Sequence, residues 1–417
     1  MAIRLKIART EKELDDVFKL RYDVYVQERK KFTPAPSKDP RIVDRFDALP
    51  DVVNATAYYN DTAIAAMRIN KDSPIGLPAE EYFDFSAVRQ KLHDEFLQGD
   101  GVEPVIVGGS MLAIHKDWRN RRNVIFALFR TASGVMKSWD ATHVIGSISQ
   151  ETLSLYGRIG FEAIGEERWD ESVGDSLVPI LAPYDKVFDW TFGGISSTIG
   201  PFWSENFCGR FERLLLSPGD VLFSQGDLAE EAYAIDEGWI SISRTDFDNN
   251  EMVLANLSKG ALFGELAILD DEPRSATATA ITNVGLIVLG RDHMLDILKQ
   301  HPEKMRQLLR HFSRRVRDLD DLTMVQAFAP QSSRVAFALN QLWQEAATDR
   351  KDPSIRVAKV GPAQIAKAAQ VREHEVLLVL ETEKLKGHLD YGKQVIRFFR
   401  LPQIGPFTGV EKEVPMN

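Results

Sequence analysis

The sequence predicts a multi-domain α+β protein in which three blocks of different pattern follow one another. A chain of 417 residues corresponds to about three domains at roughly 150 residues each. Residues 1–190 alternate helical and strand patterns. Residues 205–300 consist of short strands with turn signals about every 8–12 residues, which favours a β-barrel or a β-roll. Helical patterns return from residue 301 and end in two short strands, so a third, mainly helical block is expected.

The composition is that of ordinary folded domains and excludes several classes of protein. With 44% hydrophobic and 27% charged residues, the chain can bury real cores and is not globally disordered. The one cysteine, Cys208, allows neither an internal disulfide nor a multi-cysteine metal site, and we expect no metal. We find no membrane-spanning run and no signal peptide, so a cytoplasmic location is expected. The net charge of −10 excludes a basic field over the whole molecule for nucleic acid.

The boundaries of the predicted domains follow changes of pattern. A Gly/Ser/Thr stretch after the first block is typical of a linker, and Pro330 breaks the long helical pattern that precedes it. The predicted segments are an N-terminal domain at 1–190, a linker at 191–204, a strand-rich domain at 205–300, a long helix at 301–329, a C-terminal domain at 330–402 and a tail at 403–417.

The string FGELAILDDEPRSATATA, from Phe263 to Ala280, carries the chemistry of a phosphate and ribose site. Gly264 permits close backbone approach, and the N–H groups of such a turn can hold a phosphate. Arg274 offers a planar pair of donors to phosphate oxygens, and Glu265, which only accepts hydrogen bonds, suits a ribose hydroxyl. A 3′,5′-cyclic nucleotide presents these two groups. From the chemistry alone, a surface turn with a salt bridge remains the alternative.

This string closely resembles the phosphate-binding cassette of cyclic-nucleotide-binding domains, and the resemblance covers about 205–328. It implies a β-roll followed by a long dimerisation helix, with cAMP or cGMP as the effector. It also implies that Glu265 binds the ribose 2′-hydroxyl. The implied phosphate contacts are Arg274, Ser275 and the backbone of Gly264 and Ala276.

The long helix departs from the family at the base. A Thr-Ser pair meets adenine in the cAMP receptor protein, and the aligned positions here are Leu319 and Asp320. An aspartate could accept from the adenine amino group or from guanine N–H donors, so cAMP and cGMP both stay open. The helix also carries an apolar stripe typical of a coiled-coil seam, so we predict a homodimer. The stripe comprises Leu308, Leu309, Phe312, Val316, Leu319, Leu322 and Met324.

Residues 360–399 resemble the winged helix-turn-helix of Crp-type regulators, whose second helix enters the major groove of DNA. The base-reading Arg-Glu pair and a later Arg of that family fall on Glu373, His374 and Leu378, and neither Glu nor Leu can donate twice to guanine. The candidate DNA contacts are Arg372, His374 and Lys393. Weak DNA binding and a role as a dimer or interaction module both stay open.

Two strings in the first block resemble GNAT acyltransferases. SMLAIHKDWRNRRNVIFALF reads as a strand, a basic loop and a helix, and a helix N-terminus after a basic loop is an anion site. ETLSLYGRIGF matches a helix-turn in which a Tyr at the position of Tyr156 often protonates the leaving thiolate. The resemblance implies the GNAT fold, an acyl thioester as donor and Tyr156 as a catalytic acid. His115 is a candidate general base or a structural histidine.

The basic loop departs from the GNAT pattern, because Arg122 and Val124 stand where the family has glycines. Side chains there obstruct the pyrophosphate of coenzyme A. The phosphopantetheine arm of an acyl carrier protein has a single phosphate, which Arg119, Arg121 and Arg122 suit. We therefore expect an acyl carrier protein as the donor partner, with coenzyme A thioesters as the alternative.

Residues 1–185 resemble the branch of acyl-homoserine-lactone synthases and N-acyl amino acid synthases, through RYDVY, DRFD and Arg68 in order and spacing. Gly108 and Met111 stand where the lactone synthases have Glu and Arg, which argues against S-adenosylmethionine and favours another amine as acceptor. A buried or surface ion network that ties the N-terminal helices is the alternative role for the shared residues. The residues implied on the acceptor side are Arg21, Asp44 and Asp47.

Three functions are compatible with these patterns. The first is an N-acyltransferase that is regulated by a cyclic nucleotide and transfers an acyl chain from a thioester to an amine. The second is a DNA-binding transcription regulator of the Crp class whose N-terminal domain senses acyl groups. The third and weakest is a nucleotide-gated protein-lysine acyltransferase. The altered recognition helix favours the first function, whereas the altered basic loop would favour the second if it abolished the chemistry.

Overall fold

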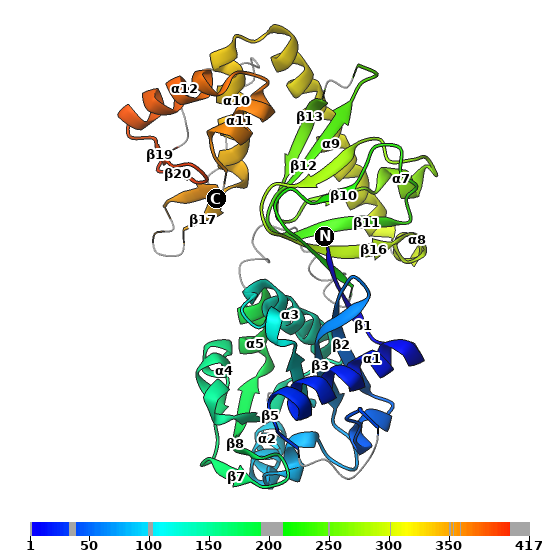
Figure 1. Cartoon of the computed structure of the whole chain (residues 1–417). Coiled ribbons are helices and arrows are strands. Elements are labelled where there is room, and N and C mark those ends of the chain that lie inside the picture. Colours follow the sequence, from blue (N-terminus) through cyan, green and yellow to red (C-terminus); the bar gives the residue numbers. More distant parts are fainter. Residues whose placement is uncertain are drawn as a thin grey trace. The chain divides into compact units, whose positions relative to one another are not determined.

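The structure, a computed structural model, comprises two compact units (Figure 1). The first unit is Met1–Leu216 with Gly285–Leu289, and the second is Ser217–Val284 with Gly290–Asn417. Cys208, most of the predicted linker and the predicted tail lie outside the described residues. The structure describes residues 2–32, 39–98, 103–192, 212–248, 251–300, 302–349, 352, 354–358 and 360–400.

The first unit is built on a mostly antiparallel sheet (Figure 1). Strands β1 to β4 pair antiparallel in chain order, β4 pairs with β5 in parallel, and β8 returns antiparallel beside β5. Strands β6 and β7 both pair with β8, and β9 pairs with β1. The bounds are β1 (Ile3–Ile7), β2 (Val52–Tyr59), β3 (Thr62–Lys71), β4 (Ile106–Ile114), β5 (His143–Ser149), β6 (Glu162–Ala163), β7 (Arg168–Asp170), β8 (Asp175–Pro183) and β9 (Arg213–Leu216).

Helices cover both faces of this sheet, because its central strands are apolar on both sides. Neighbouring Ala65 and Ala66 of β3 point to opposite faces. Ala66 packs with the first helix, on what we call the α1 face, and Ala65 packs with the third, on the α3 face. The bounds are α1 (Glu11–Arg21), the π-helix η1 (Tyr22–Glu28), η2 (Arg45–Ala48), η3 (Pro78–Glu81), α2 (Ser86–Leu97), η4 (Lys116–Trp118), α3 (Arg122–Ser138), η5 (Gln150–Thr152), α4 (Leu153–Ile159) and α5 (Tyr184–Phe192).

The parallel strands β4 and β5 separate soon after they begin. Their pairing ends at Gly108 and Ile145, although β4 continues to Ile114 and β5 to Ser149. The register of β4 against β3 also shifts near Met111, whose φ of +51° lies in the left-handed region. Such a bulge bends a strand and turns it away from its neighbour.

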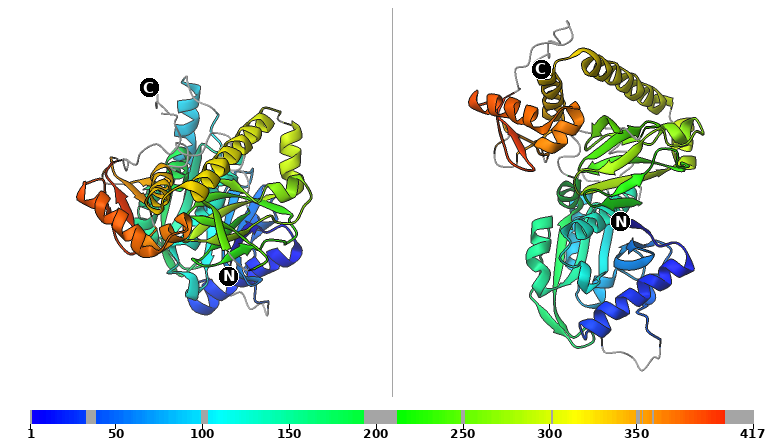
Figure 2. Two further views of the ribbon diagram at one scale, coloured as in Figure 1. Left: turned by 90° about the horizontal axis from the view of Figure 1, so that it is seen from above. Right: turned by 45° about the horizontal axis from the view of Figure 1, so that its top comes forward.

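The second unit begins with the strands of a β-roll (Figure 1). Its sheet has the order β10-β15-β12-β13 and is open, so the strands form a roll rather than a closed barrel, and β11 pairs with β14. Figure 2 shows the predicted long helix as α9, one uninterrupted element. The bounds are β10 (Val221–Phe223), β11 (Glu231–Glu237), β12 (Ile240–Thr245), β13 (Glu251–Leu257), β14 (Leu262–Phe263), α7 (Leu266–Leu269), β15 (Thr277–Ala280), α8 (Arg291–Gln300) and α9 (Pro302–Phe328). Strand β16 (Val284–Gly290) follows β15 in the chain, and its residues Gly285–Leu289 belong to the first unit.

The C-terminal part of this unit has the predicted order of helices followed by a two-stranded wing. Gln370, with a φ of +53°, ends α11, and α12 begins three residues later. A Cβ on Gly361 would lie 1.9 Å from the carbonyl oxygen of Lys393, so the wing can approach α11 only because this residue is glycine. The bounds are α10 (Gln331–Glu345), β17 (Ala347–Thr348), β18 (Arg356–Ala358), α11 (Pro362–Ala369), α12 (Glu373–Leu385), β19 (Leu389–Tyr391) and β20 (Ile396–Phe398).

The β-roll and the C-terminal helices share one hydrophobic cluster. Trp239, which directly precedes β12, is buried in the same cluster as Leu339 of α10 and Ile365 of α11. Lys367 of α11 forms an ion pair with Glu251 of β13 at 2.8 Å. These contacts join the roll and the C-terminal helices into one compact unit.

Candidate active site and nucleotide pocket

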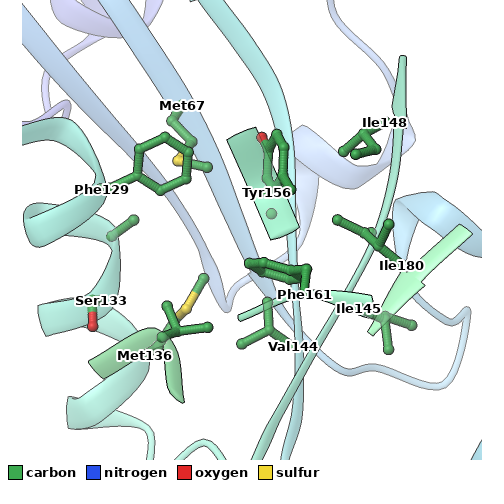
Figure 3. A pocket seen from close by; sticks show the side chains of 14 residues that line it. Met67, Phe129, Ser133, Met136, Val144, Ile145, Ile148, Tyr156, Phe161 and Ile180 are labelled. Carbon is green, nitrogen blue, oxygen red and sulfur yellow. The ribbon is translucent and has the colours of Figure 1, made fainter. Parts of the chain in front are cut away.

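An apolar pocket lies on the α3 face of the sheet where β4 and β5 separate. Figure 3 shows its walls, to which α3, α4 and the two strands contribute. The cavity holds about 20 Å³, which is the room of about one water molecule. A bound hydrocarbon chain would therefore have to displace side chains of the wall. The lining residues are Met67, Gly109, Phe129, Ala132, Ser133, Met136, Val144, Ile145, Gly146, Ile148, Tyr156, Phe161, Ile180 and Val187.

Two strand glycines make room in this pocket. A Cβ on Gly146 of β5 would lie 3.4 Å from Cγ1 of Ile180, and one on Gly109 of β4 would lie 3.5 Å from Cε of Met67. These are ordinary contact distances, so a methyl group would fit while a larger side chain would fill the cavity. The sequence analysis did not select these glycines, although a glycine inside a strand pattern is a signal of close approach.

Tyr156 lies in the wall of the pocket, packed between two aromatic rings (Figure 3). Its ring centroid is 5.8 Å from that of Phe129 and 5.4 Å from that of Phe161. Burial, with a smaller effect of Tyr25, raises the pKa of Tyr156 above its ordinary value. The phenol therefore stays protonated at neutral pH and is a weaker acid than an exposed tyrosine.

Tyr25 is a second buried phenol close to the same strand. Its hydroxyl donates to the carbonyl oxygen of Leu112 at 2.9 Å, next to the bulge at Met111. Burial raises the pKa of Tyr25 to about 12. The hydrogen bond fixes the end of η1 against the part of β4 that leaves β5.

Three of the predicted acceptor-side residues meet in one ion network on the α1 face. Asp47 accepts from Arg21 at 2.9 Å and lies 3.0 Å from Arg68, which also donates to both carboxylate oxygens of Asp44. The side chains of Arg21, Arg68 and Asp47 are 0–2% exposed, whereas that of Asp44 is 27% exposed. Asn54, which the sequence analysis missed, accepts from Arg21 at 2.5 Å. Asp44 is thus the member of the network that solvent reaches.

Of the three arginines in the basic loop before α3, one is paired with a carboxylate and two lie at the start of the helix. The guanidinium of Arg119 donates to the carboxylate of Glu28 at 2.8 Å and is already paired. Arg121 precedes α3 and lies over the ring of Trp118, 4.7 Å from its centroid, and Arg122 begins the helix. Two arginines and the free N–H groups of a 17-residue helix therefore gather at one helix end, which favours an anion there.

His115, the candidate general base, caps the turn η4 that precedes the basic loop. The Nδ1 atom of His115 accepts from the backbone N–H of Asp117 at 3.4 Å, at the start of η4. Within the described residues, no group of three or more His, Cys, Asp and Glu side chains could hold a metal ion. In the same part of the chain, no helix is long and apolar enough to cross a membrane.

Arg274, the predicted phosphate contact of the second unit, is buried among carbonyl groups and an aromatic ring. Its guanidinium is 5% exposed and donates to the carbonyl oxygens of Gly264 at 2.7 Å and Glu231 at 2.6 Å. It also lies 4.1 Å from the ring centroid of Phe223. Burial lowers the pKa of Arg274 below its ordinary value. A bound phosphate would offer this guanidinium charged acceptors in place of neutral carbonyl groups.

The other predicted nucleotide contacts surround Arg274. Gly264 has a φ of +72°, and a Cβ on it would lie 2.7 Å from Nη1 of Arg274, so only glycine fits here. Glu265 and Ala276 are buried, whereas Ser275 is exposed. Asp320 is exposed on α9, and the side chain of Leu319 lies outside the described residues.

Some residues of the apolar stripe of α9 are buried and others are exposed to solvent. Leu308 is buried, whereas Leu309, Val316 and Met324 are each more than half exposed. The side chain of Leu322 lies outside the described residues. An exposed apolar row on a long helix is what a coiled-coil partner would cover.

The candidate DNA contacts Arg372, His374 and Lys393 are exposed at the start of α12 and in the wing. The recognition helix presents less negative charge than its sequence indicates. Glu383 is only 3% exposed and bonds to His388 at 2.7 Å and Lys386 at 2.8 Å.

The comparisons with known proteins agree with this division of the molecule. Residues 16–182 match the family model described as N-acyl amino acid synthase FeeM, and residues 213–301 match the cyclic nucleotide-binding domain. The chain joins a FeeM-type domain to a cyclic-nucleotide-binding domain. The pocket, the ion network and the basic loop all lie in the FeeM-type domain, and Arg274 lies in the nucleotide-binding domain.

Individual relatives resemble parts of the chain. It is 34% identical over 135 residues to the cyclic AMP receptor protein of Thermus thermophilus, which covers 32% of this chain and 62% of the relative. It is 34% identical over 130 residues to the CRP-like cAMP-activated global transcriptional regulator of Mycobacterium tuberculosis, with 31% and 58% covered. The chain thus spans about 60% of the length of these curated relatives. The solved structure of FeeM, an N-acyl amino acid synthase from uncultured soil microbes, aligns at 13% identity with a TM-score of 0.36, covering 45% of this chain and 92% of FeeM.

Proposed function

We propose that this protein is an N-acyltransferase whose activity is regulated by a cyclic nucleotide. The observation that carries the proposal is the apolar pocket between the separated strands β4 and β5, with the protonated phenol of Tyr156 in its wall. All lining residues of this pocket except Val187 lie within the residues that match an N-acyl amino acid synthase. An acyl chain in the pocket would place its thioester where the strands separate.

In the proposed reaction, the neutral acceptor amine attacks the thioester carbonyl carbon. A C–N bond forms, the C–S bond breaks, and the leaving thiolate takes a proton from Tyr156. The proton that the nitrogen loses returns through water to the Tyr156 oxygen, so the products are an amide and a thiol. The phosphate of the donor binds at the N-terminus of α3 beside Arg121 and Arg122. We propose an amino acid as the acceptor, because the matching family is described as an N-acyl amino acid synthase.

The proposed donor is an acyl carrier protein. Arg122 and Val124 occupy the first turn of α3, and their side chains leave less space for a pyrophosphate than glycines would. A pantetheine arm brings one phosphate and no adenosine to this helix end. We expect transfer from the acyl carrier protein to be at least tenfold more efficient than transfer from acyl-coenzyme A.

The proposed regulation acts through the pocket around Arg274. A nucleotide changes the rate only if it binds more tightly to one arrangement of the chain than to another. Arg274 now donates to the carbonyl oxygens of Gly264 and Glu231. A bound phosphate would replace these carbonyl oxygens as its partner, and this local change would favour one arrangement of the chain.

The test is acyl transfer by the purified full chain with both donors, with amino acids and a lysine peptide as acceptors, and with or without cAMP and cGMP. Amino acid acylation that responds to a nucleotide is the expected result. Equal rates with and without saturating nucleotide would exclude the regulation. Absence of transfer to any acceptor, with no effect of Tyr156→Phe, would exclude the enzyme.

A DNA-binding transcription regulator is the second candidate. The observation that favours it is the exposure of Arg372, His374 and Lys393 on one helix-turn-helix and wing. Selection of a defined palindromic DNA site, bound at nanomolar affinity in physiological salt, would make this the main function.

A further inference from the structure

The sheet face opposite the acyl pocket is the side from which an acceptor amine would approach. In β5, Gly146 and Ile148 line the pocket on the α3 face. Because side chains alternate along a strand, Ser147 and Ser149 point to the α1 face. Helices α3, α4 and α5 cover the pocket side, whereas Ser147 and Ser149 are partly exposed on the other side.

Lys31 lies at the end of β5 on this α1 face. Its ammonium donates to Oγ of Ser149 at 3.1 Å and forms an ion pair with Asp175, to which Ser149 also donates. The side chains of Lys31 and Asp175 are 14% and 19% exposed. Burial opposes ionisation of Asp175, but Lys31 and Ser149 hold the pKa of this carboxyl below its ordinary value. The carboxyl of Asp175 is therefore ionised, and both side chains are mostly shielded from solvent.

The backbone around Lys31 adopts an uncommon conformation that points the residue inward. Lys30 and Phe32 have φ values of +56° and +52°, in the left-handed region that side chains disfavour. The backbone N–H of Lys31 donates to the carbonyl of Tyr25 at 2.7 Å, and the ring of Phe32 packs edge-on against the ring of Tyr25. Such strain concentrates where a protein holds a group for a ligand.

The donors of Lys31 are not all used. An ammonium has three N–H donors, and Ser149 and Asp175 are its two partners among the described residues. The neighbouring cations Arg21 and Arg68 both pair with the buried Asp47, although Nε of Arg21 has no hydrogen-bond partner. Lys31 differs from them in that its remaining donor is on a side chain that is 14% exposed.

We propose that Lys31, positioned by Ser149 and Asp175, binds the carboxylate of the amino acid acceptor and thereby selects amino acids over simple amines. This inference rests on the proposed N-acyltransferase function. It assigns Lys31 a role in acceptor specificity and none in proton transfer.

The test compares the full-length protein with Lys31→Met, Lys31→Arg and the matched control Lys30→Met, which removes one charge from the exposed neighbour. The twenty protein amino acids are offered first, and the best acceptor is then compared with the amine obtained by its decarboxylation. We expect Lys31→Met to raise KM for the amino acid at least tenfold, with kcat within twofold. Its kinetics with the amine should not change. Lys31→Arg should recover most of the affinity, and Lys30→Met should match the wild type.

Equal effects of Lys31→Met on amino acid and amine would overturn the proposal, because a merely structural role predicts them. No effect on either acceptor would overturn it as well. If the wild type acylates no acceptor, the proposed function fails, and equilibrium dialysis with radiolabelled amino acids decides the inference alone. Binding by the wild type that weakens at least tenfold in Lys31→Met would uphold the site, and binding that is absent or unchanged would refute it.

Discussion

Arg274 is the residue on which the proposed nucleotide site depends most, because its guanidinium is buried beside Glu265 and Gly264. We expect Arg274→Ala to weaken cyclic-nucleotide binding by at least thirtyfold, since loss of one partner from a buried charged pair costs about 2–5 kcal/mol. Calorimetry with cAMP and cGMP measures the effect. Lys299→Ala, on the exposed side of α8, is the control and should bind normally. Failure of the wild type to bind either nucleotide would disprove the site.

Glu13 gives α1 an acid-sensitive contribution to stability. Burial opposes its ionisation, but the backbone N–H groups of Arg9 and Thr10 and the ammonium of Lys6 lower its pKa to about 2. Because the folded pKa lies below the ordinary value of 4.5, the contribution is present above pH 4.5 and is lost as the pH falls toward 2.

Glu13→Gln keeps a hydrogen-bond acceptor and removes the charge. We expect it to lower the free energy of unfolding by about 2 kcal/mol at pH 7, and the difference should shrink between pH 4.5 and pH 2. Urea unfolding at several pH values measures this. A difference that stays constant with pH would show that the charge is not its cause.

At the residue scale, the sequence predicts groups whose partners are local or belong to a motif. Arg21, Asp44 and Asp47 meet in one ion network through Arg68, which is the alternative role that the sequence left open, and their acceptor-side role stays a prediction. The pairing of Arg119 with Glu28 could not be predicted, because 91 residues separate them and only the fold brings them together. For the same reason, the sequence of the basic loop suggests three arginines without partners, whereas Arg119 is already paired with Glu28.

At the scale of elements, the pocket between β4 and β5 predicts a size limit at Gly146. We expect Gly146→Leu to fill the cavity and reduce transfer of long acyl chains at least tenfold, with a smaller effect on short chains. Gly146→Ala is the control, because its Cβ would lie at the ordinary distance of 3.4 Å from Ile180. Kinetics with donors of increasing chain length measures this, and equal losses at all lengths would argue against an acyl pocket.

The exposed row on α9 predicts a two-fold dimer. Val316 is 58% exposed, and we expect Val316→Glu to weaken dimerisation at least tenfold, because a charge would be buried in the seam. Gln331→Glu, which adds the same charge at the exposed start of α10, should not change it. Light scattering over a range of concentrations measures the mass. A wild type that stays monomeric at micromolar concentration would contradict the prediction.

The order and type of the elements followed from the sequence more readily than their local irregularities. The β-roll, α9 and the helix-turn-helix were predicted, because turn residues and helical spacing are local signals. The bulge at Met111 was not, since no glycine marks its left-handed conformation and pairing with β3 enforces it. The start of the predicted linker was placed within α5, whose last residue is Phe192.

At the scale of the whole molecule, the net charge of −10 argues against strong binding to DNA. Arg372 and Lys393 can contact phosphates, but the aligned base-reading positions lack arginine. We expect binding that is weak, falls steeply as salt rises and differs little between sequences. Fluorescence anisotropy with unrelated duplexes at several salt concentrations measures this, and strong preference for one sequence would contradict it.

The hydrophobic cluster around Trp239 makes ligand binding at one end of the second unit detectable at the other. The cassette runs from Arg274 directly into β15, and Ile281, the next residue after that strand, donates its N–H to the carbonyl of Trp239. A ligand that binds only the folded state suppresses the openings of every segment that unfolds with its site. Amide hydrogens of α10 and α11, which belong to the same cluster as Trp239, should therefore exchange with solvent more slowly once a cyclic nucleotide is added.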